Sequence, residues 1–144
     1  MRSKFFNLFV ILVGITAIIL LPGCGNRADD RLEAALASDV EAQNIGYGDT
    51  TFRFEVLDLD YNVSVWYVST NEETVGAALL EVGLIAGEDG AFGLFVSEVN
   101  GITADFSADN TWWAFFIDGE SAMMGVGETT IEPETTYAFV LTES

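Results

Sequence analysis

The chain is poor in the side chains that most often do chemistry. It has no histidine and a single cysteine, Cys24, among its 144 residues. The absence of histidine removes the usual general base and the commonest metal ligand. Carboxylates are plentiful, with 23 aspartates and glutamates, but none stands beside a distinctive catalytic motif. Because candidates for a base or a nucleophile are so few, we expect a protein without enzymatic activity and without a required cofactor.

One acidic segment, Asp58–Asn62, imitates the start of a calcium-binding loop. Such a loop requires glycine at its sixth position and glutamate at its twelfth. Those positions hold Val63 and Ser69 in this chain. We therefore expect the segment to be the turn of a hairpin, and we predict no metal site.

Aromatic residues are better candidates for a binding site. Trp112 and Trp113 are adjacent on a predicted strand, so their side chains face opposite sides of a sheet. One ring is expected in the core, and the other either packs against a second layer or forms a stacking platform for a planar ligand or peptide. Trp66 is out of phase with its apolar neighbours and is expected on the same outward face. Met123 and Met124 would add adaptable apolar surface at the edge of this patch.

The first 24 residues indicate where the protein lies. Arg2 and Lys4 precede an apolar run, Phe5–Leu21, which ends in Leu21-Pro22-Gly23-Cys24. A basic start, an apolar stretch and small residues at a processing site are typical of an export signal. The ending is similar to a bacterial lipobox, in which cleavage exposes a cysteine that carries lipid. We expect residues 1–23 to be a signal peptide, Cys24 to be lipidated and the rest to face outward at the cell membrane. The alternative is an uncleaved helix, for which 17 apolar residues are few.

The mature chain is strongly acidic. After the signal peptide, three arginines stand against 23 acidic residues, a net charge of −20. Such a surface repels nucleic-acid phosphates and anionic lipid headgroups, so we expect no nucleic-acid partner. The simplest explanation is solubility and repulsion from an anionic cell envelope. Two others stay open: attraction of cations, a basic partner or a cation-bearing ligand, and a salt-rich habitat.

Composition divides the mature chain into a tether and one domain. Residues 24–50 are polar and weakly patterned, which favours the lipidated cysteine and a solvated tether. A short amphipathic helix within Ala28–Val40 is the alternative. Residues 51–144 form the domain, which is long enough for a single hydrophobic core. Its alternating start predicts a hairpin, and the spacing that follows predicts a helix capped by Thr74 and ended by Gly83.

More strands are expected after the helix. They lie at residues 92–96, 102–106, 112–117, 120 to about 126, and 137–141. The segment Glu88–Gly90 is interpreted as a loop, and Asp118-Gly119 is a strong signal for a two-residue hairpin turn. No internal repeat is visible. The elements predict an α+β fold in which one helix covers a twisted, mostly antiparallel sheet.

Several of these motifs together resemble the DUF4430 family, the transcobalamin-like C-terminal domain of many exported bacterial lipoproteins. The resemblance spans Thr74–Thr142. The residues that carry it are Thr74-Val75-Gly76-Ala77-Ala78-Leu79, Gly101-Ile102, Trp112-Trp113-Ala114-Phe115-Phe116-Ile117-Asp118-Gly119-Glu120 and Gly125-Val126. The chain departs from the family at Glu132-Pro133-Glu134, where Gly-Asp is common.

The resemblance implies a β-grasp-like fold related to ligand-binding modules. In transcobalamin and intrinsic factor, the corresponding domain closes over a cobalamin that a larger helical domain holds, and that larger domain is absent from this sequence. The sequence therefore predicts a surface-anchored, non-catalytic lipoprotein with a small ligand-binding module for a corrinoid-like or other planar ligand. The alternative is a protein-interaction or envelope-assembly module with an envelope protein as partner.

Overall fold

The computed structural model describes Leu32 and residues 39–144. The expected signal peptide (residues 1–23) and Cys24 lie outside the described residues. Within the described part, no helix is long and apolar enough to cross a membrane. The strands are β1 (Gln43–Gly46), β2 (Thr50–Leu57), β3 (Val63–Thr70), β4 (Ile85–Gly90), β5 (Gly93–Val99), β6 (Ile102–Thr103), β7 (Thr111–Ile117), β8 (Glu120–Ser121) and β9 (Thr136–Glu143). The helices are α2 (Val75–Glu81), α3 (Phe106–Asp109) and the 3₁₀ helix η1 (Val126–Glu128).

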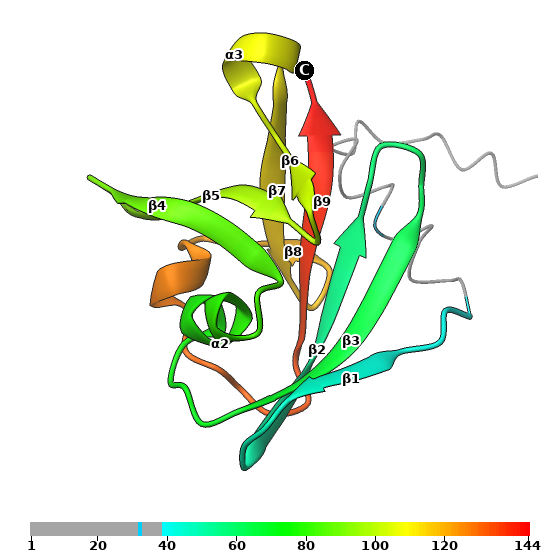
Figure 1. Ribbon diagram of the computed structural model, residues 1–144, viewed down its shortest axis with the longest axis vertical. Helices are drawn as coiled ribbons and strands as arrows, with labels where there is room; N and C mark the ends of the chain where they lie inside the picture. Colours follow the sequence, from blue (N-terminus) through cyan, green and yellow to red (C-terminus); the bar gives the residue numbers. More distant parts are fainter. Residues whose placement is uncertain (1–31, 33–38) are drawn as a thin grey trace, which may run out of the picture.

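Six strands form the main sheet, in the order β1-β3-β2-β9-β7-β8 (Figure 1). The hairpin of β2 and β3 is antiparallel, as the sequence predicts. The last strand, β9, lies between β2 and β7; it is parallel to β2 and antiparallel to β7. The first and last parts of the domain therefore meet at the centre of the sheet. The expected α+β class is confirmed.

One face of the main sheet, which helix α2 covers and which we call the front face, holds most of the core. Phe52, Phe54 and Val56 alternate along β2, and Tyr137 and Phe139 belong to the same cluster from β9. Their rings pack edge to face, with centroids 5.3 Å apart for Phe52 and Tyr137 and 6.2 Å apart for Phe54 and Phe139. On β2 and β9, the period-two pattern places the aromatic side chains on this face.

Helix α2 packs on this front face. Its cap is Thr74, whose side-chain oxygen accepts a hydrogen bond from the amide of Ala77 at 3.3 Å. Gly83 follows the helix with φ of +72°, a conformation in which glycine ends helices readily. Both ends of the helix thus confirm the expectation from sequence. Gly76 lets the helix approach η1 closely, since a Cβ there would lie 2.7 Å from the Cα of Gly127.

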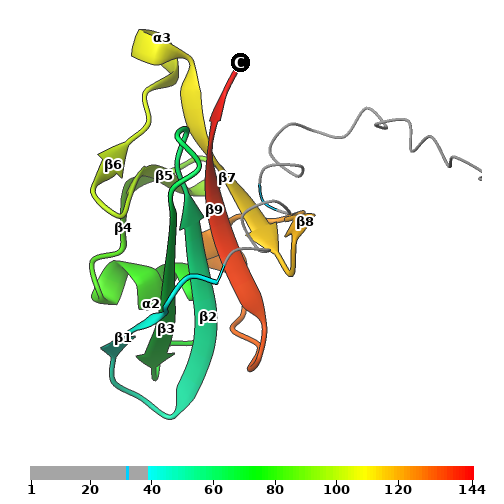
Figure 2. The ribbon, with the colours of Figure 1, turned by 90° about the vertical axis from the view of Figure 1, so that its right-hand side faces the viewer.

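A second sheet, in the order β4-β5-β6, covers the rest of the front face. Figure 2 shows it beside α2, on one side of the main sheet. Residues Glu88–Gly90, interpreted from sequence as a loop, belong to β4 and pair with β5. The sequence also predicts a strand over 102–106, but β6 stops at Thr103 and Phe106 begins the short helix α3.

The back face of the main sheet is also apolar and covered. Leu32 is buried there in a cluster with Leu57, Phe116, Ala138 and Val140. In addition, β1 pairs in parallel with β3, although both Leu32 and β1 belong to the segment assigned to the tether. The folded domain therefore begins before residue 51, because the back face of the sheet and the edge of β3 need partners.

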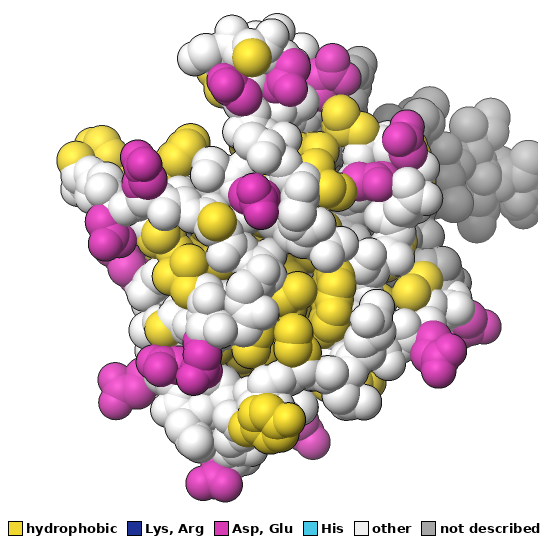
Figure 3. Space-filling model, viewed as in Figure 1, with side chains coloured by type: hydrophobic (Ala, Val, Ile, Leu, Met, Phe, Trp, Pro, Cys, Tyr) yellow, Lys and Arg dark blue, Asp and Glu magenta, His cyan; other side chains and the backbone are white. Residues whose placement is uncertain are grey.

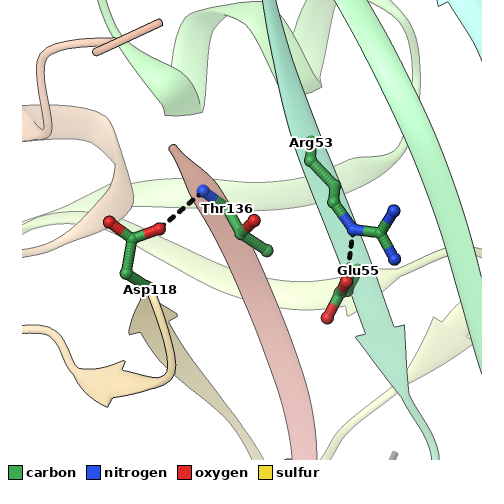
Figure 4. Close-up of polar contacts among 4 residues, drawn as sticks. All are labelled: Arg53, Glu55, Asp118 and Thr136. Carbon is green, nitrogen blue, oxygen red and sulfur yellow. Dashed lines mark hydrogen bonds and ion pairs between the residues drawn. The ribbon is translucent and has the colours of Figure 1, made fainter. Parts of the chain in front are cut away.

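Two turns fix the register of the main sheet. In the β2–β3 turn, the Asp58 carboxylate accepts hydrogen bonds from the amides of Asp60 and Asn62 at 2.8 and 2.9 Å, which makes the segment a hairpin turn, as expected. After β7, Asp118 and Gly119 take φ of 49° and 81°. The Asp118 carboxylate then accepts the amide of Thr136 at 2.9 Å (Figure 4). The return strand β8 has two residues rather than the expected seven.

Candidate functional site

A cavity of about 840 Å³ lies between the second sheet and β7. Strand β5 forms one wall, β7 and Phe139 of β9 form another, and the segment from β6 into α3 closes one end. The lining residues are Leu94, Phe95, Val96, Ser97, Thr103, Ala104, Asp105, Phe106, Ser107, Thr111, Trp112, Trp113, Phe115, Gly125, Val126 and Phe139. Six of them are aromatic and one is ionisable. The volume lies within the range of small-molecule sites in proteins.

Aromatic contacts make the wall formed by β7 and β9 rigid. The ring of Phe115 lies 5.1 Å from that of Phe139, and the indole of Trp113 meets Phe139 edge to face at 6.5 Å. Phe115 also stacks on Tyr137 at 6.2 Å. Ring contacts of this kind stabilise a packed wall beyond the burial of area alone.

The two adjacent tryptophans have different roles. Trp113 is 8% exposed, and its indole N–H donates to the carbonyl of Ile102 at 3.2 Å. Trp112 is 36% exposed and packs against Phe106 of α3, with ring centroids 6.0 Å apart. The expectation that one ring is in the core and the other points outward is therefore met, with Trp112 as the outward ring. Both border the cavity, because α3 folds over the start of β7.

Trp66 does not join this outward patch. It is 6% exposed and lies on the front face, with its ring 6.0 Å from that of Phe54. The expectation that Trp66 faces outward is therefore wrong. Trp66 and Val68 point into the main core, and Tyr67 is exposed. Alternation alone does not distinguish the two faces here, because the back face of the sheet is apolar as well.

The two methionines lie beside the cavity but do not line it. Met123 is 99% exposed and Met124 is exposed as well. Both belong to the loop between β8 and η1, and the next residue, Gly125, is a lining residue. The two methionines are therefore close to the cavity in sequence without lining it.

Two other residues, Phe95 and Phe106, line the cavity although the sequence analysis did not single them out. The only signals for these two were an apolar run around Phe95 and a capping Asp105 before Phe106.

Two polar side chains at the closed end of the cavity, Asp105 and Thr111, have hydrogen-bond partners within the protein. Asp105 caps α3, accepting the amides of Ser107 at 2.9 Å and Ala108 at 3.1 Å. Thr111 accepts the amide of Asp105 at 3.1 Å and donates its hydroxyl to Asp109. This hydrogen bond from Thr111 holds the pKa of the Asp109 carboxyl below its ordinary value. The side chains of Asp105 and Thr111 are thus bonded within the end wall.

The cavity is remote in the fold from the one cation of the described residues. Arg53 lies on the back face of β2, where its Nε contacts the Glu55 carboxylate at 2.6 Å (Figure 4). Glu55 is 3% exposed, and its hydrogen bond raises the pKa of the Arg53 guanidinium. Across residues 39–144, no three carboxylates gather closely enough to hold a metal ion.

The surface of the domain combines acidic and hydrophobic side chains. Figure 3 shows a notch between the projection that carries α3 and the projection formed by β4 and β5. Hydrophobic side chains lie on both projections, with acidic side chains around them. Phe95 and Phe106, which line the cavity, are among the exposed large hydrophobic residues.

Comparisons with known proteins agree with the resemblance seen in the sequence. A "putative metal binding protein" from Ruminococcus gnavus ATCC 29149 has a similar structure, with a TM-score of 0.63 and 26% identity over 67% of this chain and 99% of that chain. Haptocorrin in complex with Cbi is also similar, with a TM-score of 0.50 and 15% identity over 65% of this chain. That match covers 25% of haptocorrin, so it indicates a shared fold alone. No curated protein matches the chain.

The family comparison covers the helix, the cavity and the last strand. The family described as "Domain of unknown function (DUF4430)" matches residues 72–143, which is half of the 144 residues. The matched range contains every residue that lines the cavity. The chain belongs to the DUF4430 family.

Proposed function

We propose that the protein is a small-molecule binding module whose ligand occupies the cavity between the second sheet and β7. The observation that carries this proposal is the cavity itself, with a volume of about 840 Å³ and six aromatic lining residues. Sites for organic ligands are concave, mostly apolar and supplied with a few polar groups. The walls here belong to strands and to a capped helix, so the site is preformed.

The ligand that best suits these walls is flat and largely apolar. The exposed ring of Trp112 and the ring of Phe106 present aromatic surface at the cavity, and flat molecules stack on such surfaces. A corrinoid-like ligand belongs to this class, and the fold shared with haptocorrin supports testing it first. The described residues do not supply the carboxylate cluster that a metal ion would need, so no metal enters the proposal.

The arrangement and location of the module form part of the same proposal. The β2–β3 hairpin, the helix α2 and the parallel placement of β9 beside β2 support a β-grasp-like arrangement. Lipid attachment at Cys24 would tether the domain outside the cell membrane, where it binds without catalysing a reaction. The chain has no histidine, and lipid attachment would leave its one cysteine without a free thiol, which supports this proposed non-catalytic role.

A fluorescence titration tests the proposal. The chain from residue 25 to 144, which contains all the described residues, is titrated with cobinamide and with cobalamin, after correction for corrinoid absorbance. Saturable quenching that Trp112→Ala abolishes and that Trp66→Phe, at a ring that does not line the cavity, retains would support ligand binding at the cavity. The absence of a saturable response up to millimolar ligand would overturn the corrinoid assignment and leave other planar ligands.

The second candidate is a protein-interaction module, which the exposure of Met123 favours. Adaptable thioether side chains are common on binding surfaces, and Met124 is also exposed. This candidate predicts that a photo-crosslinker at position 123 captures an envelope protein in cells. A crosslinker at Tyr47, which is equally open to solvent and does not line the cavity, is the control. Equal capture at both positions would reject a specific surface at Met123.

A further inference from the structure

The charge of the cavity wall restricts which ligands can enter. Asp105 is the sole ionisable residue among the sixteen that line the cavity. Its carboxylate is held at the start of α3 by the amides of Ser107 and Ala108. The wall therefore carries a fixed negative charge. Among the described residues, no lysine or arginine lines it.

In the part of the chain that the structure describes, no cationic side chain lies at the cavity beside Asp105. Arg53 is the single lysine or arginine within residues 39–144, and it lies on the back face of the main sheet, paired with Glu55. Asp109, at the far end of α3, is held ionised by the hydroxyl of Thr111, which lowers the pKa of its carboxyl. Among residues 39–144, therefore, no cation stands at the cavity to offset the repulsion between its wall and an anion.

Two hydrogen-bond donors of the cavity walls already have acceptors within the protein. The indole N–H of Trp113 donates to the Ile102 carbonyl, and the hydroxyl of Thr111 donates to Asp109. These donors are not free to replace the water that surrounds a carboxylate or a phosphate. Losing that water without a new partner makes burial of an anion costly.

Aromatic ring faces attract organic cations. Phe95, Phe106 and Trp112 all line the cavity and are exposed, so a ligand can reach their rings. A cation near such a face is stabilised by the ring quadrupole, most strongly by tryptophan and when partly desolvated. The negative charge of Asp105 acts in the same direction.

We propose that the cavity selects flat, apolar organic cations over neutral and anionic molecules of the same shape. The inference rests on the proposed function, because it presumes that a ligand occupies this cavity. It assigns a specific role to part of the acidic surface, namely attraction of a cation-bearing ligand. It also defines the ligand class by charge and shape.

Three bicyclic aromatic probes of similar size test the selectivity. Equilibrium dialysis of the chain from residue 25 to 144 measures binding of 1-methylquinolinium (a cation), 1-methylnaphthalene (neutral) and 1-naphthoate (an anion). We expect the cation to bind about tenfold more tightly than the neutral probe, the middle of the range for cation–aromatic contacts, and the anion to bind most weakly. Trp112→Ala should weaken cation binding about fivefold or more, whereas Tyr47→Ala, at an exposed ring outside the cavity, should not change it.

The outcomes separate this inference from the proposed function. Equal binding of the cation and the neutral probe, both weakened by Trp112→Ala, would overturn the charge selectivity and leave the binding module standing. Cation binding that ignores Trp112→Ala and disappears in 500 mM salt, a concentration that screens surface charge at roughly a few ångströms, would also overturn it, since general attraction to the acidic surface would explain it. If none of the probes binds saturably, the cavity is not the ligand site that we propose.

Discussion

The two adjacent tryptophans should differ sharply in their effect on folding. Trp113 is buried at the wall between the two sheets and donates its N–H to Ile102. Trp113→Ala removes a large core side chain and should lower the free energy of unfolding by about 3–5 kcal/mol. Trp112 is partly exposed and has a ring contact with Phe106, so Trp112→Ala should cost about 1 kcal/mol.

Urea denaturation followed by circular dichroism measures this difference. With a slope of roughly 2 kcal/mol per molar urea, Trp113→Ala should move the midpoint down by about 2 M, and Trp112→Ala by about 0.5 M. Trp113→Phe is the matched control: it keeps a buried ring and removes the hydrogen bond to Ile102, so its loss should lie between the two, at about 1–2 kcal/mol. Equal midpoint shifts for the two alanine variants would refute the assignment of Trp113 as the buried ring and Trp112 as the partly exposed one.

Three other substitutions test the packing and the charges. Gly76→Ala should destabilise the fold by about 1–2 kcal/mol even though alanine favours helices, because its Cβ would lie 2.7 Å from the backbone of η1; stabilisation measured by urea denaturation would contradict that close approach. Arg53→Met should cost about 2 kcal/mol, since the buried Glu55 carboxylate loses its partner, and Glu55→Gln in the same chain should recover part of the loss. Because the folded-state pKa of Asp109 lies below its unfolded value, owing to Thr111, ionised Asp109 stabilises the fold above the unfolded pKa, and this contribution disappears as the pH falls through the folded pKa. The difference in the free energy of unfolding between the wild type and Asp109→Asn should therefore shrink as the pH falls. A difference that does not change with pH would contradict the lowered pKa of Asp109.

Elements whose side chains alternate or whose ends carry specific caps could be predicted from the sequence. The alternation of Phe52, Phe54 and Val56 identifies β2, and Thr74 and Gly83 delimit α2, as the structure confirms. At β2 and α2, the residues that favour the element locally are also the residues that its packing in the fold needs, so the local pattern predicts the structure correctly. The family resemblance covers α2 but not β2, and the family comparison, which matches residues 72–143, bears it out.

Strand β4 could not be predicted because its sequence has the composition of a turn. Residues Glu88–Gly90 are polar and glycine-rich, yet they pair with β5. The pairing depends on backbone groups, and at Gly87 it excludes any side chain: a Cβ there would lie 2.0 Å from the carbonyl oxygen of Phe95. Glycine marks close approach of another backbone as well as a turn, and the local sequence does not distinguish the two.

The face of Trp66 was mispredicted for a different reason. Both faces of the main sheet are covered, by α2 and the second sheet in front and by the Leu32 cluster behind. On β3, Val65 is buried on the back face while Trp66 is buried on the front. When both faces are apolar, alternation identifies a strand without identifying its orientation. The cavity could not be predicted from the sequence either, because β5 and β7, which line it, come together only in the tertiary fold.

The position of the single described cation links the fold to the ligand that we propose. Glu55 is buried on the back face, so a cation must stay beside it to avoid a large desolvation penalty, and Arg53 fulfils this role from two residues away on the same strand. Residues on one face of a strand recur at every second position, so Arg53 cannot also reach the front face, where the cavity lies. Among the described residues, the pair that stabilises the back face therefore leaves no cation at the cavity. A new arginine or lysine at the cavity, for example at Ser107, should weaken binding of an organic cation without disturbing the pair of Arg53 and Glu55.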